Sequence, residues 1–305
     1  MNTSLHHSET IFNSLSKNNF TSSLSDIAIK HIITIMITIF TLGYKGKTVD
    51  FERNSDNHRT TVGYFLNKGK WDSGSLESAL KEFVVNIIYG ESIKRGKPVF
   101  IIIDDTITSK TKPSSKAVHP IENAYFHQSH LKGEQDYGHQ AVGVMLSCNG
   151  ITMNYDIILY DKTVSKIKLI CNIADELRTA PNVSYLLCDR WYTCSKVTDA
   201  FIQKGFYTIV AVKTNKIISP CGIKISISKL AENICEEDNF FHPVTVKGRK
   251  YLVYRCECNL KDIDNAVVLI IYPAGAFHNP KALRAFICTN ADISTEDILG
   301  MYTGR

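Results

Sequence analysis

Two acidic segments each follow a run of apolar residues, and they are the positions where this sequence could carry out chemistry. Asp104 and Asp105 come directly after residues 99–103, and Asp189 comes directly after residues 183–188. The positions 105 and 189 are separated by 189 − 105 = 84 residues. If the two runs form neighbouring strands, their ends hold the carboxylates rigidly and within reach of a shared divalent cation. An aspartate after a strand also serves commonly as a turn or helix cap, which is the simpler interpretation of either one alone.

Carboxylate oxygens are the ligands that Mg²⁺ prefers, and two such ions can activate a water and stabilise the leaving oxygen in phosphodiester cleavage. We therefore expect Asp105 and Asp189 to be catalytic metal ligands, with Asp104 as a substitute for Asp105. The expected cofactor is Mg²⁺ in a two-metal site, with Mn²⁺ as its substitute.

The elements around the acids alternate in a recognisable order. Residues 99–103 read as a buried strand, and Asn149-Gly150 lies between two strand-like runs, 140–147 and 151–160, as the turn of a hairpin. Helical spacing follows over 164–178, then a strand over 183–188, a helix over 196–204 and a strand over 206–212. The order β-β-β-α-β-α-β, with acids closing the first and fourth strands, is typical of an RNase H-like fold. We expect a mixed α/β sheet flanked by helices.

The rest of the chain adds modules to this core. Residues 1–24 are rich in Ser, Asn and Thr and predict a flexible arm, and residues 25–95 predict a helical module that could contact DNA or another protein. Residues 96–305 form the expected catalytic domain, in which short β-like runs over 217–272 predict an inserted β subdomain.

Composition excludes several classes. The chain has 305 residues, 44% of them hydrophobic and 21% charged, which is ordinary for a globular protein and unlike a disordered one. The most apolar stretch, residues 32–42, is too short to cross a bilayer, and the N-terminus lacks a secretory signal, so we expect a cytoplasmic protein with no membrane partner. Nine cysteines without a Cys-x-x-Cys pair indicate free thiols. A net charge of +5 is compatible with a polyanionic partner.

Three motifs together resemble those of insertion-sequence DDE transposases, which have an RNase H-like catalytic domain and a Tyr-Arg-Glu-Lys signature. The first is Ile103-Asp104-Asp105-Thr106, and the second is the block from Leu187 to Thr193 with the strand that follows it, residues 205–215. The third is Tyr302-Thr303-Gly304-Arg305, which is similar to the start of the signature Tyr-x2-Arg-x3-Glu-x6-Lys. The Glu and Lys of that signature would fall beyond Arg305.

The resemblance implies a DNA transposase that cleaves and joins strands at terminal inverted repeats as a homodimer on double-stranded DNA, in a prokaryotic-type, nucleoid-associated setting. It implies that Tyr302 and Arg305 contact DNA near the scissile phosphate, and that the missing Glu completes the metal site. A chain truncated before that Glu is expected to bind Mg²⁺ weakly and to be inactive alone.

Further DNA contacts are expected at lysines and arginines near the acids, in the expected insertion and in the loop after the first strand. These are Lys213 and Lys216, then Lys247, Arg249 and Lys250, then Lys110 and Lys112. Trp191 and Tyr192 could stack on a base, although an aromatic pair after a strand usually belongs to the core.

Two other functions remain open. The chain could be a catalytically inactive protein that only binds transposon ends and inhibits a full-length partner. It could also be another RNase H-like nuclease, in which Asp156, Asp161 or Glu296 supplies the third acid.

Overall fold

The computed structural model describes residues 2–22, 24–43, 48–53, 57–117, 121–129, 132–235, 240–260 and 263–304. The chain divides into two compact units, residues 1–86 and 87–305. The expected boundary between the helical module and the catalytic domain lay at residue 95. The long helix α5 (Ser73–Arg95) runs across the observed boundary, because its 3.6-residue apolar spacing continues through it.

The first unit is helical, as the spacing of its apolar residues predicted. Besides the beginning of α5 it contains α1 (Asn2–Lys17), α2 (Asp26–Thr41), α3 (Thr48–Arg53) and α4 (Arg59–Lys68). The Ser25 side chain caps α2 by accepting a hydrogen bond from the backbone N–H of Ala28. Residues 1–24 were expected to be a flexible arm, but most of them form α1. Phe20 explains the difference, because it is buried and its ring packs edge-on against Phe83 at 5.5 Å, which anchors the segment.

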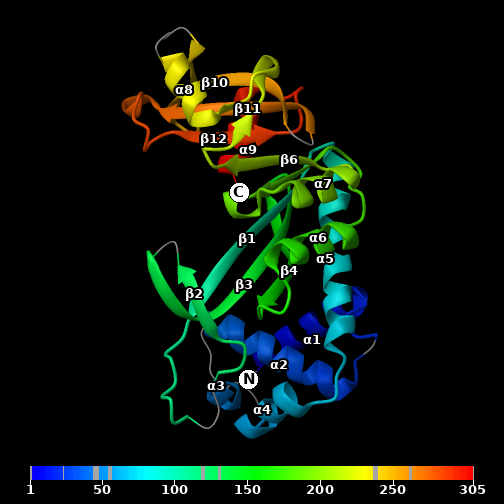
Figure 1. The fold of residues 1–305 in the computed structure, drawn as a ribbon. Coiled ribbons are helices and arrows are strands. Elements are labelled where there is room, and N and C mark those ends of the chain that lie inside the picture. Colours follow the sequence, from blue (N-terminus) through cyan, green and yellow to red (C-terminus); the bar gives the residue numbers. More distant parts are fainter. Residues whose placement is uncertain are drawn as a thin grey trace. The chain divides into compact units, whose positions relative to one another are not determined.

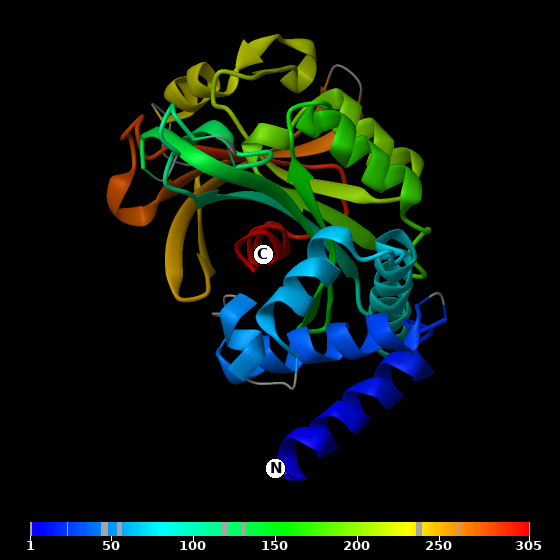
Figure 2. The same cartoon turned by 90° about the horizontal axis from the view of Figure 1, so that it is seen from below.

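The second unit is built on one large mixed sheet with helices on both faces (Figures 1 and 2). Its central strands lie in the order β4-β3-β1-β5-β6. β1 is antiparallel to β3 and parallel to β5, and β5 is parallel to β6. This is consistent with the expected RNase H-like order. The bounds are β1 Val99–Ser109, β3 Glu134–Cys148, β4 Ile151–Tyr160, β5 Ser184–Cys188 and β6 Tyr207–Val212.

The predicted hairpin turn at Asn149-Gly150 joins β3 to β4. Both residues have positive φ, 51° and 82°, which a two-residue turn of this kind requires. A further strand, β2 (Tyr125–Ser129), pairs with the first part of β3. The sequence analysis placed only a loop there, because β2 is short and lacks a clear alternation of apolar and polar residues.

The expected β insertion extends the main sheet instead of forming a separate subdomain. β12 (Arg284–Cys288) pairs with β6, and β11 (Ile263–Pro273), β10 (Arg249–Leu260) and β9 (His242–Val246) follow it outward (Figure 1). Before them lie the short ribbon β7–β8 (Ile217–Ile218 and Ile225–Ser226) and helix α8 (Ile227–Cys235). The described residues include the single-turn 3-10 helices η1 (Arg190–Tyr192), η2 (Pro220–Gly222) and η4 (Ala274–Ala276).

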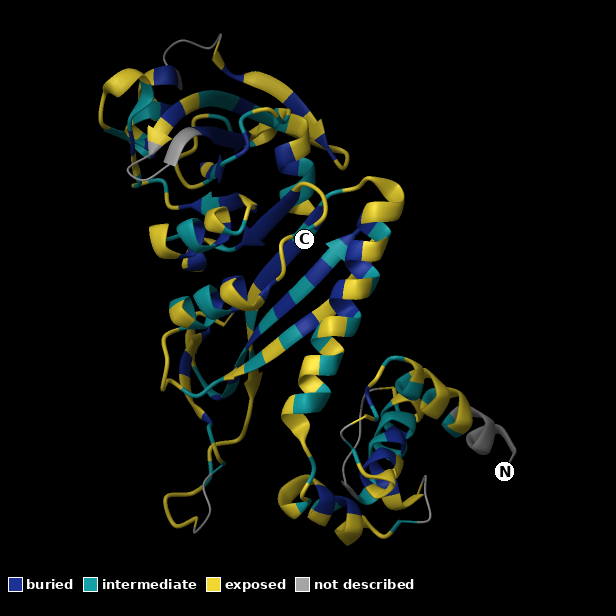
Figure 3. Cartoon of the chain, turned by 90° about the vertical axis from the view of Figure 1, so that its right-hand side faces the viewer, coloured by how far each residue is buried: buried dark blue, intermediate teal, exposed yellow. Residues whose placement is uncertain are grey.

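The two faces of the sheet differ in what covers them, and the strands between are largely buried (Figures 2 and 3). Ile298 and Leu299 of helix α9 (Thr295–Thr303) belong to one buried apolar cluster with Ile102 and Leu187, and we call this side of the sheet the α9 face. Helices α6 (Lys166–Glu176) and α7 (Ser195–Gln203) lie on the opposite side (Figure 2). Because side chains alternate along a strand, Ile101, Ile103 and Cys188 belong to that opposite face.

No helix in the described part of the chain is long and apolar enough to cross a membrane.

Gly138 is required where three strands meet, since its backbone pairs with Ser109 of β1 and with Tyr125 of β2. A Cβ at this position would collide with the carbonyl oxygen of Thr108 and lie 2.9 Å from its carbonyl carbon. We expect Gly138→Ala to lower the free energy of unfolding by about 1 to 3 kcal/mol, because backbone atoms cannot move aside without disturbing the sheet.

Chemical denaturation of this variant measures the effect. Gly143→Ala is the matched control on the same strand, because a Cβ at residue 143 would meet nothing closer than the Asp104 carbonyl oxygen at 3.8 Å. Equal stability of the two variants would contradict the prediction.

Candidate active site and nucleic-acid groove

The pairing of β1 with β5 places two aspartates side by side. Ile103 is in register with Cys188, the last residue of β5, so the next residues in register are Asp104 and Asp189. Asp189 keeps an extended backbone, with φ −75° and ψ 163°, and so continues the alternation of β5 by one residue. Ile102 and Leu187, two residues earlier, both belong to the α9 face. Asp104, in the middle of β1, and Asp189, just after the end of β5, therefore lie side by side on neighbouring segments about 4.8 Å apart, on the side that α9 covers.

Asp105 lies on the opposite face of β1. Its carboxylate accepts a hydrogen bond from the Gln140 amide and forms an ion pair with the Lys166 ammonium at 2.5 Å. The Asp105 and Lys166 side chains are only 21% and 23% exposed. The sequence analysis preferred Asp105 to Asp104 as the partner of Asp189. The register instead brings Asp104, the substitute, to Asp189, because a shift of one residue in a strand reverses the face.

The η1 turn after Asp189 buries a tyrosine hydroxyl near both adjacent carboxyl groups of β1. Tyr192 is 1% exposed, and its hydroxyl has no hydrogen-bond partner of good geometry among the described residues. Burial, followed by the negative charges of Asp105 and Asp104, raises the pKa of Tyr192 far above its ordinary value. A phenolate there would be repelled by both carboxylates, so Tyr192 stays neutral and acts as a structural support.

Asp104 and Asp189 are held by short local bonds while their side chains reach the surface. One Asp104 oxygen accepts the Asp105 N–H at 2.9 Å, and one Asp189 oxygen accepts the Arg190 N–H at 2.7 Å. Two carboxylates fixed in this way on neighbouring segments are hard oxygen donors that suit a divalent cation. Within the described ranges, no group of three or more His, Cys, Asp or Glu side chains is arranged to hold a metal ion.

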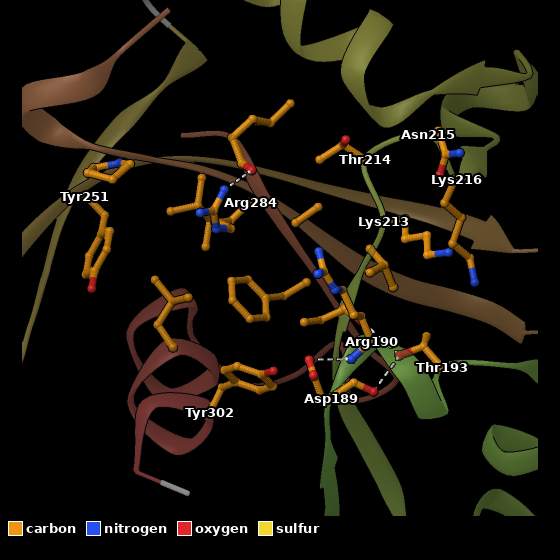
Figure 4. A pocket seen from close by; sticks show the side chains of 18 of the residues that line it. Asp189, Arg190, Thr193, Lys213, Thr214, Asn215, Lys216, Tyr251, Arg284 and Tyr302 are labelled. Atoms are coloured by element: carbon orange, nitrogen blue, oxygen red, sulfur yellow. Dashed lines mark hydrogen bonds between the residues drawn. The ribbon is translucent and has the colours of Figure 1, made fainter. Parts of the chain in front are cut away.

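A groove of about 1420 Å³ opens beside Asp189 (Figure 4). It is bordered by residues of η1, the segment after β6, β12 and α9. The charged side chains on its wall are strongly unequal: Asp189 is the acid, and the bases are Arg190, Lys213, Lys216, Lys281 and Arg284. Such an excess of positive charge in a concave surface attracts polyanions.

The antiparallel pairing of β6 with β12 assembles the basic wall. Ala285 is opposite Val212, which brings Arg284 beside Lys213 although 71 residues (284 − 213) separate them in the chain. The Arg284 guanidinium donates hydrogen bonds to the carbonyl oxygens of Lys281 and Leu283, which fix its orientation. Arg190, Lys281 and Arg284 were not predicted from the sequence. Arg190 directly follows Asp189 and could have been inferred from that position. Lys281 and Arg284 join the site through the β6–β12 pairing, which has no local signal in the sequence.

Tyr302 lines the groove from α9, as Figure 4 shows. Its ring packs edge-on against Phe286 at 4.6 Å, so the groove side of α9 is fixed to the sheet. Arg305, predicted to act with Tyr302, lies outside the described residues. Trp191 is 63% exposed and also lines the groove, whereas its neighbour Tyr192 belongs to the core.

The remaining predicted DNA contacts are not among the residues that line the groove. Lys247 is in the β9–β10 turn, and its ammonium donates to the carbonyl oxygen of Thr303 at the end of α9. Arg249 and Lys250 are exposed at the beginning of β10. Lys110 and Lys112 are exposed just beyond β1. The structure thus brings Lys213, Lys216 and Tyr302 together with Asp189 and separates the other five.

Comparisons with known proteins give little beyond this geometry. No protein-family model and no curated protein sequence matches the chain. One similar solved structure is the Drosophila P element transposase strand transfer complex, with 10% sequence identity and a TM-score of 0.22. The similarity covers 76% of this chain and 57% of that chain. The chain therefore spans less than two thirds of the neighbour's length, and a likeness at this TM-score says nothing about function.

The ion pair of Asp105 with Lys166 is expected to support the fold. In a double-mutant cycle of Asp105→Asn and Lys166→Met, we expect a coupling of about 1.5 to 3 kcal/mol in the free energy of unfolding, because both partners are largely shielded from water. Denaturant titration of the four proteins measures it.

The control cycle uses Glu91 and Arg95, an ion pair on α5 whose arginine side chain is 56% exposed. We expect at most about 0.5 kcal/mol from this helix-surface pair. A coupling at Asp105 and Lys166 no larger than the control would show that the pair is not structural.

Proposed function

We propose that this chain is a DNA transposase, a metal-dependent enzyme that cleaves and transfers DNA strands at transposon ends. The observation that carries the proposal is the register of β1 and β5, which aligns Asp104 with Asp189 on the side where α9 and the basic groove lie. The resemblance of the sequence motifs and the order of the central strands support the same class.

The two aspartates fit the role of metal ligands. They lie side by side, Asp104 within β1 and Asp189 just after β5, and their carboxylates are oriented by backbone N–H groups. Mg²⁺ or Mn²⁺ prefers such oxygen donors. When bound, the metal ions supply an activated water and stabilise the departing oxygen. Asp105 does not join them in this proposal, because Lys166 and Gln140 already satisfy its carboxylate.

The groove fits the role of DNA-binding surface. Its lining contains five basic side chains and one acid, so the negative phosphates of DNA are attracted to the whole wall. Arg284, held by two backbone carbonyls, presents a fixed guanidinium to one phosphate. Tyr302 and Trp191 border the same groove near Asp189 and would limit how the strand approaches the carboxylates. A homodimer on DNA stays a prediction.

A second candidate function is favoured by one observation. No third His, Cys, Asp or Glu in the described residues joins Asp104 and Asp189 as a metal-binding group. Metal ions would then be held weakly, and the chain would bind transposon ends without cutting them. Both candidate functions require a DNA-binding groove, so a DNA cleavage assay is the experiment that distinguishes them.

The metal pair is tested by three matched substitutions. We expect Asp104→Asn and Asp189→Asn each to abolish Mn²⁺-dependent nicking of supercoiled plasmid, because each removes a charged ligand. We expect Asp105→Asn to keep most of it. Calorimetric titration with Mn²⁺ gives a readout that does not require turnover, and it should show weakened binding in the first two variants alone.

Two results would change the conclusion. Loss of Mn²⁺ binding on Asp105→Asn and not on Asp104→Asn would restore Asp105 as the ligand. Duplex binding without any nicking by the wild-type chain would favour the inactive DNA-binding protein.

The basic wall is tested by the pair Lys213→Ala and Arg284→Ala. We expect the double variant to bind duplex DNA more weakly whatever its sequence, and the slope of log affinity against log salt to fall by about 2, since two phosphate contacts are lost. Fluorescence anisotropy at several salt concentrations measures both quantities.

The control is the double variant Lys94→Ala and Lys97→Ala, which removes the same charge from exposed positions before β1. An equal loss of DNA affinity in the control variant would show that the net charge of the protein, and not the groove, determines binding.

A further inference from the structure

The α9 face continues past Asp104 as an open strip of sheet that the proposed function does not yet use. Along β1, Asp104 is followed on the same face by Thr106 and Thr108, both exposed. In β3, Tyr137 and His139 share this face through the β1–β3 register. In the described residues of these strands, Asp104 is the acid on this face, and the strip beyond it is uncharged.

β2 ends the strip with an exposed aromatic ring. Phe126 pairs with Tyr137 and therefore projects from the same face as Asp104. It is 47% exposed, although its ring packs edge-on against Tyr137 at 5.3 Å. An exposed aromatic ring on the surface of a sheet offers a face on which an unpaired base can stack.

Basic side chains lie near this ring. The Lys112 ammonium lies over the Phe126 ring, 5.2 Å from its centre. Lys110 is exposed just beyond the end of β1. Lys162 belongs to the other face, because its ammonium lies over the neighbouring Tyr125 ring. An aromatic platform bordered by cations is complementary to a nucleic acid strand, whose bases stack and whose phosphates are negative.

We infer that the strip is a binding site for single-stranded DNA, with an unpaired base stacked on Phe126 and its phosphates on Lys112 and Lys110. The bases of a duplex have their faces covered by their neighbours, so only an unpaired base can stack on the ring. Thr108 lies about 13 Å along β1 from Asp104, close enough for one strand to pass from the carboxylates to Phe126. This inference rests on the proposed function, because cleavage beside Asp104 would supply a strand end that can unpair there.

Binding of a labelled single-stranded oligothymidine by the full chain, in EDTA, tests the site without involving the metal ligands. We expect Phe126→Ala to weaken binding about 5-fold to 150-fold, because stacking on one aromatic ring has that effect. Phe126→Tyr should retain the wild-type affinity, and Lys112→Ala should lower both the affinity and the salt dependence. Binding of a duplex should be unaffected by Phe126→Ala.

The matched control is Phe240→Ala, since Phe240 is 49% exposed and lies at the edge of β9, away from the strip. Equal affinities of the Phe126→Ala and Phe240→Ala proteins, or an equal loss for single strand and duplex, would overturn the inference. If Phe126→Ala does not fold, photocrosslinking of iodouracil-containing single-stranded DNA to the wild-type chain tests the site instead. Crosslinks to β2 support the site, and crosslinks found only elsewhere refute it.

The two proposals can fail separately. Suppose that Asp104→Asn and Asp189→Asn leave nicking unchanged while Phe126→Ala weakens the binding of single-stranded DNA. The catalytic assignment is then wrong, and the assignment of the strip as a binding site still holds. If the aspartates are essential and Phe126→Ala has no effect, only the strip is wrong.

Discussion

The parallel pairing of β1 with β5 is the constraint on which the rest of the site depends. Backbone hydrogen bonds fix Ile103 opposite Cys188, and this register decides which acid of the Asp104-Asp105 pair faces Asp189. A slip of one residue would move each carboxylate to the opposite face of the sheet. The buried residues just before the acids, such as Ile102 and Leu187 on one side and Ile103 and Cys188 on the other, make such a slip costly.

The same alternation gives the adjacent aspartates different roles. Asp105 points toward α6, where the Lys166 ammonium and the Gln140 amide neutralise it. Asp104 points toward the surface that carries α9, the groove and the open strip. One carboxylate thus stabilises the fold at the point where the other is proposed to act, so a substitution at either position has to be judged by stability as well as by cleavage.

The outer strands build the surroundings of the acids. β12 adds to β6 and brings Arg284 beside Lys213, while α9 packs on the sheet and brings Tyr302 to the same groove. On the other side of Asp104, β2 adds to β3 and places Phe126 at the end of the strip. DNA contact is therefore proposed on both sides of the carboxylates, with a charged wall suited to a duplex on one side and an aromatic platform suited to an unpaired strand on the other.

Local signals in the sequence determined the central strands, the Asn149-Gly150 turn, the helices between the strands and the acid after β5, since apolar periodicity and turn chemistry depend on near neighbours. The first strand was expected to end before the acids, but β1 continues past them to Ser109. The local signals did not reveal β2, which pairs with the next strand but is short and lacks a clear alternation. They also did not reveal α1, which is followed by Phe20, a residue packed on Phe83 far along the chain. Only the tertiary structure showed which of Asp104 and Asp105 faces Asp189, assembled the basic wall from segments 71 residues apart, and joined the expected insertion to the main sheet. Those outcomes depend on strand register and edge pairing, which are set by contacts between distant segments and not by the residues of any one segment.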